Sequence, residues 1–403
     1  MIKTKQHSAS NSVLNQKDRK GAVELIKAKL PDDHLPYTDK YFSRTKEILV
    51  KDNFNPWVRY QVFSRGKPIQ VKGVDEAIAI IDKYTRLKEH GGQIWAIPEN
   101  SLINISDPKE PIMILEGPMQ DLVELETMYL GAISGGCSPL IDFGRLNESA
   151  KAIIAAAKGK PLMYFGARHF HYTLDALISK ICHDAGFSDC STDVGAKNWG
   201  TAGKGTIPHA AVLAYNSTLT VAQKFDQYID RDVPRVVLID TFNKEIDDSL
   251  SVANSLGVRL AGVRIDTCGE SIAQGANDID LKELEGFPTK YQNGKGVSIA
   301  AVWALRHALD NAGKRDVKIL VSSGFNAEKI AAFMGADKRY QEKYGNALFD
   351  SIGSGSLGAE IRIATSDIVS VLDEHTGLWM PRSKIGRGYT ESKRLVPYYQ
   401  ENR

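Results

Sequence analysis

Hydrophobic and polar residues in the first third of the chain follow both strand-like and helix-like patterns. Residues 57–63 alternate as in a half-buried strand, and apolar residues from Val74 to His90 recur at helical spacing before Gly91 and Gly92. The full set of elements predicted here is strands at 57–71 and 110–117 and helices at 74–90 and 119–133. We therefore expect residues 1–135 to form an N-terminal α+β domain.

The pattern changes after residue 135, where short β-branched runs alternate with helical segments. The predicted strands are 161–165, 236–239, 260–265, 317–321 and 348–352. Three of them are followed by helical patterns, at 174–181, 246–253 and 326–334. This alternation is typical of parallel βα units, so the predicted class is α/β, with residues 136–365 forming the larger domain. We expect the last segment, 366–403, to pack back on the N-terminal domain.

Composition excludes several classes of protein. Lys plus Arg is 51 and Asp plus Glu is 49, a net charge of +2, which gives no electrostatic footprint for nucleic acid or an anionic membrane. No stretch approaches the roughly 20 apolar residues of a membrane span, and the polar N-terminus carries no secretory signal. The four cysteines form no CxxC pair, so no zinc or disulfide framework is expected. These features predict a cytoplasmic protein.

Polar residues gather at the carboxyl ends of the predicted parallel strands. They are Phe165 to Arg168, Asp240 and Thr241, Asp266 and Thr267, Ser322 to Gly324, and Gly353 to Ser356. Parallel strands in an α/β barrel converge at their carboxyl ends, where the active site lies. Capping of the following helices is the alternative for any single pair. The five ends together favour a site.

Two of these ends predict a phosphate site. Glycine-rich turns have backbone N–H groups that can bind an anion. Two such turns are predicted, one at Ser323 and Gly324 and one at Gly353, Ser354, Gly355 and Ser356. Tight turns are the alternative. The segment 353–358 also matches GxGxxG, but only 50 residues follow Gly353, too few for a dinucleotide-binding sheet.

His209 is the remaining candidate for chemistry. It follows a glycine-rich loop, 200–206, that fails the P-loop pattern because Gly205 stands where Ser or Thr is required. A histidine among apolar residues is most often part of the core, and the alternative is an acid, a base or a phosphoryl acceptor.

Nine segments in order carry a family resemblance. They are TDKYFSRT (38–45), EGP followed by LVELET (116–118 and 122–127), FGARHFH (165–171), STD (191–193), GTIPHA (205–210), LIDTF (238–242), GVRIDT (262–267), VSSGFN (321–326) and IGSGS (352–356). In these segments the chain resembles nicotinate phosphoribosyltransferases, most closely the archaeal-type branch. The resemblance implies an irregular TIM-like α/β barrel with an N-terminal α+β domain, assembled as a homodimer or higher homo-oligomer. It also implies formation of nicotinate mononucleotide and pyrophosphate from nicotinate and phosphoribosyl pyrophosphate, coupled to ATP hydrolysis, in NAD biosynthesis.

The resemblance also implies roles for individual residues. Phe165 would stack on the pyridine ring, Tyr41 of a partner subunit would cover its other face, and Arg168 would bind near its carboxylate. Arg264 and Asp266 would hold the ribose, Ser323, Gly324 and Gly353 to Ser356 the 5′-phosphate, and His209 would be phosphorylated by ATP. Asp240 is assigned to substrate binding. Mg²⁺ would accompany pyrophosphate, with its protein ligands unassigned.

Two alternatives to nicotinate transfer stay open. Thr192 aligns with the position where related nicotinamide enzymes carry an aspartate. A shift of one residue would place Asp193 there and predict nicotinamide or another azaaromatic base. The second alternative is a catalytically silent barrel that binds a phosphosugar.

Overall fold

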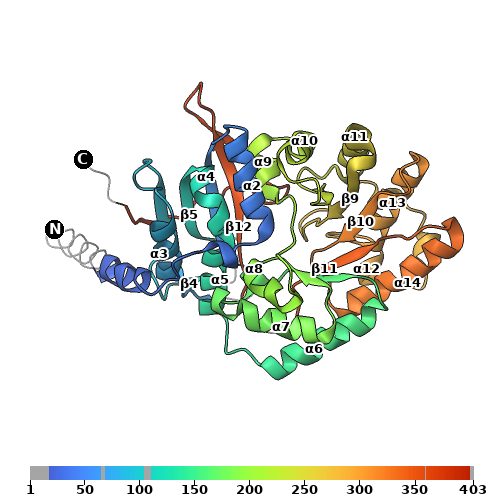
Figure 1. Cartoon of the computed structure of the whole chain (residues 1–403), viewed down its shortest axis with the longest axis horizontal. Helices are drawn as coiled ribbons and strands as arrows, with labels where there is room; N and C mark the ends of the chain where they lie inside the picture. The colour runs from blue at the N-terminus through green and yellow to red at the C-terminus, as the bar shows by residue number, and fades with distance from the viewer. Residues whose placement is uncertain (1–17, 65–68, 104–109, 359, 400–403) are drawn as a thin grey trace, which may run out of the picture.

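Two six-stranded sheets organise the computed structural model, which describes residues 18–64, 69–103, 110–358 and 360–399 (Figure 1). Each sheet has its own hydrophobic core. The first and last described residues lie on the side of the first sheet, near α3 (Val74–Tyr84). Residues 65–68 of the strand predicted at 57–71 and most of the polar N-terminus fall outside the described residues.

The first sheet is antiparallel and combines both ends of the chain. Its order is β13 (Trp379–Pro381), β12 (Ala364–Leu372), β1 (Trp57–Ser64), β5 (Pro111–Pro118), β3 (Gln93–Ala96) and β14 (Val396–Pro397). β12 pairs with β1 from Val58 to Ser64, so this C-terminal strand lies at the centre of an N-terminal sheet. A separate two-stranded sheet joins β2 (Ile69–Gln70) to β4 (Leu102–Ile103).

The second sheet is parallel and has a cyclic order of strands. It runs β7 (Asp189–Cys190), β6 (Leu162–Tyr164), β11 (Ser351–Ser354), β10 (Lys318–Val321), β9 (Leu260–Ile265) and β8 (Arg235–Leu238). The first strand, β6, therefore pairs with the last, β11, and the ladder stays open only between β7 and β8. The chain crosses that gap: Lys204 donates its backbone N–H to Cys190, and Thr206 donates its hydroxyl to the carbonyl of Val236. The result is a curled α/β sheet.

Helices surround both sheets. Besides a helix over 18–27, the described residues form α2 (Lys40–Lys51), α3, α4 (Met119–Leu122), α5 (Glu126–Cys137), α6 (Phe143–Ala157), α7 (Asp175–Ala185), α8 (Asp193–Ala196), α9 (His209–Tyr215), α10 (Thr218–Tyr228), α11 (Glu245–Leu256), α12 (Thr289–Gln292), α13 (Ile299–Asn311) and α14 (Ala327–Tyr344). α5 is buried along most of its length because it packs against α3 and β12. Across the described residues, no helix combines the length and the apolar character needed to cross a membrane.

Most predicted elements are present, and three need correction. The last parallel strand begins at Ser351, not at 348, because Leu348 and Phe349 turn into the core before pairing starts. The helix predicted at 74–90 ends at Tyr84, where Thr85 is extended. The helix predicted at 119–133 is interrupted by a 3₁₀ turn, Val123–Leu125. The domain boundaries at 135 and 365 and the closed barrel stay predictions.

Ser134 links α5 to β12 and provides a test of this packing. Its buried hydroxyl accepts the backbone N–H of Ala364 at 2.9 Å. Ser134→Ala leaves that N–H unpaired in the core, so we expect a loss of about 1–3 kcal/mol of unfolding free energy. Calorimetry should show a lower melting temperature for Ser134→Ala. The exposed Ser251→Ala on α11 should melt like the parent chain, and equal melting of both variants would contradict the packing role.

Candidate active site

A cavity of about 380 Å³ opens at the carboxyl ends of the parallel strands and reaches the antiparallel sheet. The predicted residues that line it are Tyr41, Phe165, Arg168, His209, Arg264, Asp266, Ser323, Gly324, Gly353, Gly355 and Ser356. They come from segments up to 315 positions apart (41 to 356). The strand ends therefore converge on one space, as the βα pattern predicts.

Three predicted site residues do not line this cavity. Thr192 caps α8, where its hydroxyl accepts the N–H of Gly195 and donates to buried Asp175. Ser354 donates its hydroxyl to the carbonyl of Phe325 at 2.6 Å, so it closes the loop from behind. Asp240 is fully buried and ion-paired. Their side chains contact residues behind the cavity lining and do not face the cavity.

Asp193, the neighbouring candidate for base selection, is also absent from the cavity lining. One of its oxygens pairs with Lys40 at 2.7 Å and the other accepts the N–H of Gly203. Neither residue of this pair therefore contacts a ligand in this arrangement.

An aromatic and cationic group forms one end of the cavity. The guanidinium of Arg264 lies 6.0 Å from the ring centroids of both Tyr41 and Phe165. Arg168 donates to the hydroxyl of Tyr41 and lies 3.5 Å from Asp39. Burial raises the pKa of Tyr41 above its usual value, so the hydroxyl stays protonated. This end suits a flat anionic ring.

Tyr41 reaches the cavity of its own chain, which corrects the expectation that a partner subunit brings it. The start of α2 is fixed to the parallel sheet because Lys40 donates its backbone N–H to Ser191 at 2.8 Å and Asp39 forms a bridge with Thr192. Tyr41 follows directly. The position is therefore set by contacts within one chain.

Two glycines allow the aromatic end to pack tightly. A Cβ on Gly353 would lie 2.3 Å from the ring of Phe165, and one on Gly355 would lie 2.7 Å from the ring of His169. Burial and the charge of Arg168 lower the pKa of His169 to about 4, so this ring is neutral. His169 therefore adds no second positive charge beside Arg168.

The predicted phosphate loop is strained in the way that anion-binding loops often are. Ser323 has φ of 76° and Gly324 has φ of 69°, two successive left-handed residues before the 18-residue helix α14. Lys329 in the first turn of α14 donates to the carbonyl of Ser323 at 3.0 Å. Burial lowers the pKa of Lys329 to about 8. The helix N-terminus adds positive potential at this loop.

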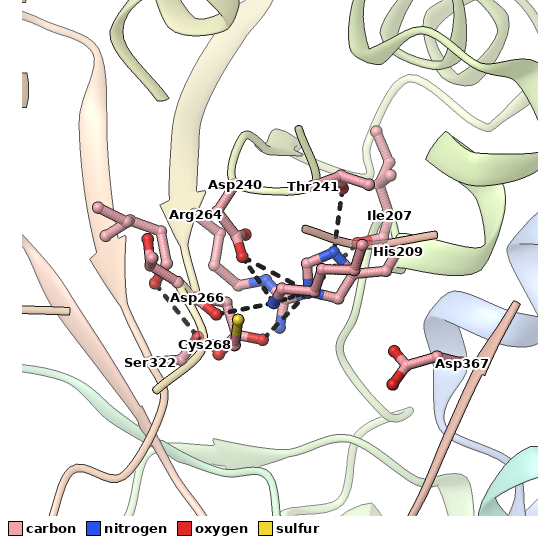
Figure 2. Close-up of polar contacts among 12 residues, drawn as sticks. Ile207, His209, Asp240, Thr241, Arg264, Asp266, Cys268, Ser322 and Asp367 are labelled. Atoms are coloured by element: carbon pink, nitrogen blue, oxygen red, sulfur yellow. Dashed lines mark hydrogen bonds and ion pairs between the residues drawn. The ribbon is translucent and has the colours of Figure 1, made fainter. Parts of the chain in front are cut away.

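His209 lies at the first position of α9, in a buried cluster of charges (Figure 2). Its Nδ1 is 3.0 Å from the hydroxyl of Thr241, and its Nε2 is 3.5 Å from Asp266 and 3.7 Å from Asp240. Lys384 Nζ lies 2.8 Å from the same Nε2. Burial and the charge of Lys384 lower the pKa of His209, so the imidazole is neutral at pH 7.

Asp266 stays ionised in this cluster. Burial alone would raise the pKa of its carboxyl, but the contact with His209 and the charges of Lys384 and Arg264 hold that pKa well below its usual range. Ser322 donates its hydroxyl to the other carboxyl oxygen at 2.7 Å. The cavity thus contains a fixed negative charge beside a neutral imidazole.

Sequence reasoning missed several residues that line the cavity: Asp39, Glu126, Asp367, Lys384 and Arg387. Asp39 and Glu126 lie inside two of the segments that carried the resemblance, so they could have been nominated. Asp367, Lys384 and Arg387 belong to the C-terminal segment. The only feature of the sequence that could have drawn attention to this segment is the cluster of basic residues at 382–387. No local pattern of hydrophobic and polar residues predicts that the segment packs against the parallel sheet.

Curated proteins that are similar to this chain share one name. No protein-family model matches the chain. Nicotinate phosphoribosyltransferase pncB2 of Mycobacterium tuberculosis is 28% identical over 250 residues, which cover 61% of this chain and 45% of that protein. Nicotinate phosphoribosyltransferase 2 of Arabidopsis thaliana is 33% identical over 135 residues, 33% of this chain and 22% of that protein. The chain spans less than half of the length of these curated relatives.

Solved structures share the fold. A nicotinate phosphoribosyltransferase from Porphyromonas gingivalis superposes with a TM-score of 0.60 at 13% identity, covering 89% of this chain and 96% of that one. Another from Vibrio cholerae gives 0.58 at 13% identity, with coverage of 86% and 90%.

Fold and site together define an α/β protein with a polar cavity at the carboxyl ends of its parallel strands. In sequence, the chain is similar to curated nicotinate phosphoribosyltransferases over part of their length. In fold, it is similar to solved structures of proteins with that name. Its place in the archaeal-type branch stays a prediction.

Glu126 gives a pH-dependent test of the cavity. Burial raises the pKa of its carboxyl from 4.5 to about 8, with Arg168 opposing and Asp367 and Asp39 adding to the shift. The folded chain therefore holds this proton more tightly than the unfolded chain. The stabilisation is complete below pH 4.5 and is lost as the pH rises through 8.

Glu126→Gln should remove this loss. We expect the variant to gain on the order of 1 kcal/mol or more over the parent chain between pH 5 and pH 9. Melting temperatures across this range measure the difference, with exposed Glu374→Gln as control. A constant difference between the Glu126 variant and the parent would show that the carboxyl is ionised throughout.

Proposed function

We propose that this protein is a phosphoribosyltransferase that joins nicotinate to phosphoribosyl pyrophosphate, releasing nicotinate mononucleotide and pyrophosphate for NAD biosynthesis. One observation carries the proposal: a single cavity contains an aromatic and cationic end, an ionised aspartate and a strained phosphate loop. The names of the curated relatives support the same reaction.

The aromatic end would hold the base. Phe165 and Tyr41 offer flat surfaces for the pyridine ring, and Arg168, ordered by Tyr41 and Asp39, would meet its carboxylate. Holding the ring nitrogen in line with C1 of the ribose turns a collision between two substrates into a step within one complex.

The centre of the cavity would serve the ribose. When pyrophosphate leaves, C1 becomes positively charged, and a fixed carboxylate nearby stabilises that charge. Asp266 is ionised and oriented by Ser322, which suits it to the ribose hydroxyls and the developing charge. Arg264 lies in β9, two residues before Asp266, and lines the same cavity.

The strained loop would bind the 5′-phosphate. Ser323 and Gly324 line the cavity just before α14, and Gly355 and Ser356 line it as well. Within the described residues, no group of three or more His, Cys, Asp or Glu side chains is placed to hold a metal ion. Mg²⁺ therefore enters the proposal bound to phosphoribosyl pyrophosphate, where it would neutralise charge on the leaving pyrophosphate.

Coupling to ATP would use His209 as phosphoryl acceptor, which its neutral ring favours. The closed barrel, the homodimer and the cytoplasmic location belong to the same proposal. The cyclic strand order, with Lys204–Thr206 across the remaining gap, supports the barrel.

The substrate is tested by pyrophosphate release from phosphoribosyl pyrophosphate and Mg²⁺. Nicotinate and nicotinamide are compared in parallel, each with and without ATP. We expect release with nicotinate, increased by ATP, because Arg168 favours a carboxylate. Release with nicotinamide but not with nicotinate would overturn the choice of base. No release with either base would favour a barrel that binds a phosphosugar without catalysis.

Asp266→Asn tests the ribose assignment. The amide keeps the shape of the side chain and removes its charge, so we expect kcat/KM for nicotinate to fall by about 10²–10³-fold. Exposed Asp247→Asn on α11 is the matched control and should leave turnover unchanged. Unchanged turnover in Asp266→Asn would show that the carboxylate does not act on the ribose.

A further inference from the structure

Lys384 brings a buried positive charge from the C-terminal segment into the centre of the cavity. Its side chain is only 2% exposed. The segment is held there because Ile385 donates its N–H to the carbonyl of Thr241, and Cys268 donates its thiol to the carbonyl of Ile385. The charge is therefore placed by contacts with the ends of β8 and β9.

The ammonium of Lys384 has three N–H donors and three acceptors around it. They are Asp240 Oδ2 at 2.7 Å, Asp266 O at 3.0 Å and His209 Nε2 at 2.8 Å. A lysine paired with a buried carboxylate is a donor only, so Nε2 of His209 must be an acceptor. That nitrogen therefore carries no proton, and Nδ1 carries it and donates to Thr241 at 3.0 Å.

Other charged groups around His209 act in opposite directions. Asp240 and Asp266 would draw a proton to the imidazole, at 3.7 and 3.5 Å from Nε2. Arg264, which donates to the carbonyl of Ile207 beside α9, acts against it along with Lys384. Lys384 is the group in direct contact with Nε2, so it decides the balance.

We infer that Lys384 is a positioning residue that keeps Nε2 of His209 unprotonated and fixes the imidazole as the Nδ1–H tautomer. Its role in coupling rests on the proposed function. In that reaction the lone pair of Nε2 attacks the γ-phosphorus of ATP, the N–P bond forms, the bond from phosphorus to the bridging oxygen breaks, and ADP leaves with that electron pair. No proton has to leave Nε2, and Lys384 is released from it to meet the phosphoryl oxygens.

The tautomer is measured by nitrogen NMR on the full chain with ¹⁵N-labelled histidine. The chain has nine histidines, and the signal of His209 is assigned by its loss in His209→Asn. We expect the unmodified chain to show a neutral ring with the proton on Nδ1 from pH 7 to 8. A proton on Nε2, or a charged ring at pH 7, would overturn the inference.

Lys384→Met separates positioning from a merely structural role. Without the ammonium, no positive charge contacts Nε2 to oppose the negative charges of Asp240 and Asp266. We therefore expect the proton affinity of His209 to rise at least tenfold. Lys384→Gln repeats the test if the methionine variant does not fold. The exposed Lys393→Met, from the same segment, should leave the His209 signal unchanged. An unchanged titration in folded Lys384→Met would refute the assigned role.

Transfer of ³²P from γ-labelled ATP to the chain tests ATP coupling separately from the position of the proton on His209. Label on His209 that falls at least tenfold in Lys384→Met supports the coupling role. The expected tautomer with no label in the unmodified chain would leave the positioning role in place and overturn ATP coupling. Full labelling of Lys384→Met would overturn the contribution of Lys384 to coupling.

Discussion

The buried ion pair between Lys384 and Asp240 is the constraint on which the rest of the site depends. Both side chains are essentially inaccessible, and a buried charge without its partner costs about 3–5 kcal/mol. The pair therefore requires the C-terminal segment to stay against the ends of the parallel strands. That same segment continues from β12 and β13 of the antiparallel sheet. One electrostatic contact thus ties the two cores together at the cavity, and it also determines which nitrogen of His209 carries a proton.

The two sheets contribute different residues to the cavity because their strands run differently. Parallel strands present their carboxyl ends at one edge, which is why Phe165, Asp266 and Ser323 meet although each follows a different strand. The other side is closed by Asp367 on β12 of the antiparallel sheet and by Glu126 at the start of α5. The carboxyl group of Asp367 pairs with Arg387, and that of Glu126 interacts with Arg168. Figure 2 shows Asp367 on its own strand, apart from the His209 cluster. Substrate-facing chemistry thus comes mainly from one core, and the second core supplies charge balance.

Local patterns predicted the parallel sheet and most of its strand ends, because hydrophobic periodicity is a property of neighbouring residues. They also placed Asp266 at a strand end, whereas the roles of His209 and Arg264 came from the family resemblance. They could not place Lys384 or Asp367, since a C-terminal strand paired with β1 depends on contacts across more than 300 positions (58 to 371). They also misjudged Ser354 and Thr192, whose types suit a ligand but whose hydroxyls are used within the protein. The side of a loop that faces the cavity is decided by packing, which sequence spacing does not encode.

The glycines of the site show how packing and chemistry are joined. Gly353 is needed because the ring of Phe165 lies against its backbone, and Gly355 because His169 and Gly166 do. Either side chain would push the aromatic surface away from Arg264 and Arg168. Gly353 and Gly355 belong to the same segment as Ser356, which lines the cavity together with Ser323 and Gly324. A larger residue at either glycine would therefore disturb both the aromatic surface and the loop predicted to bind phosphate.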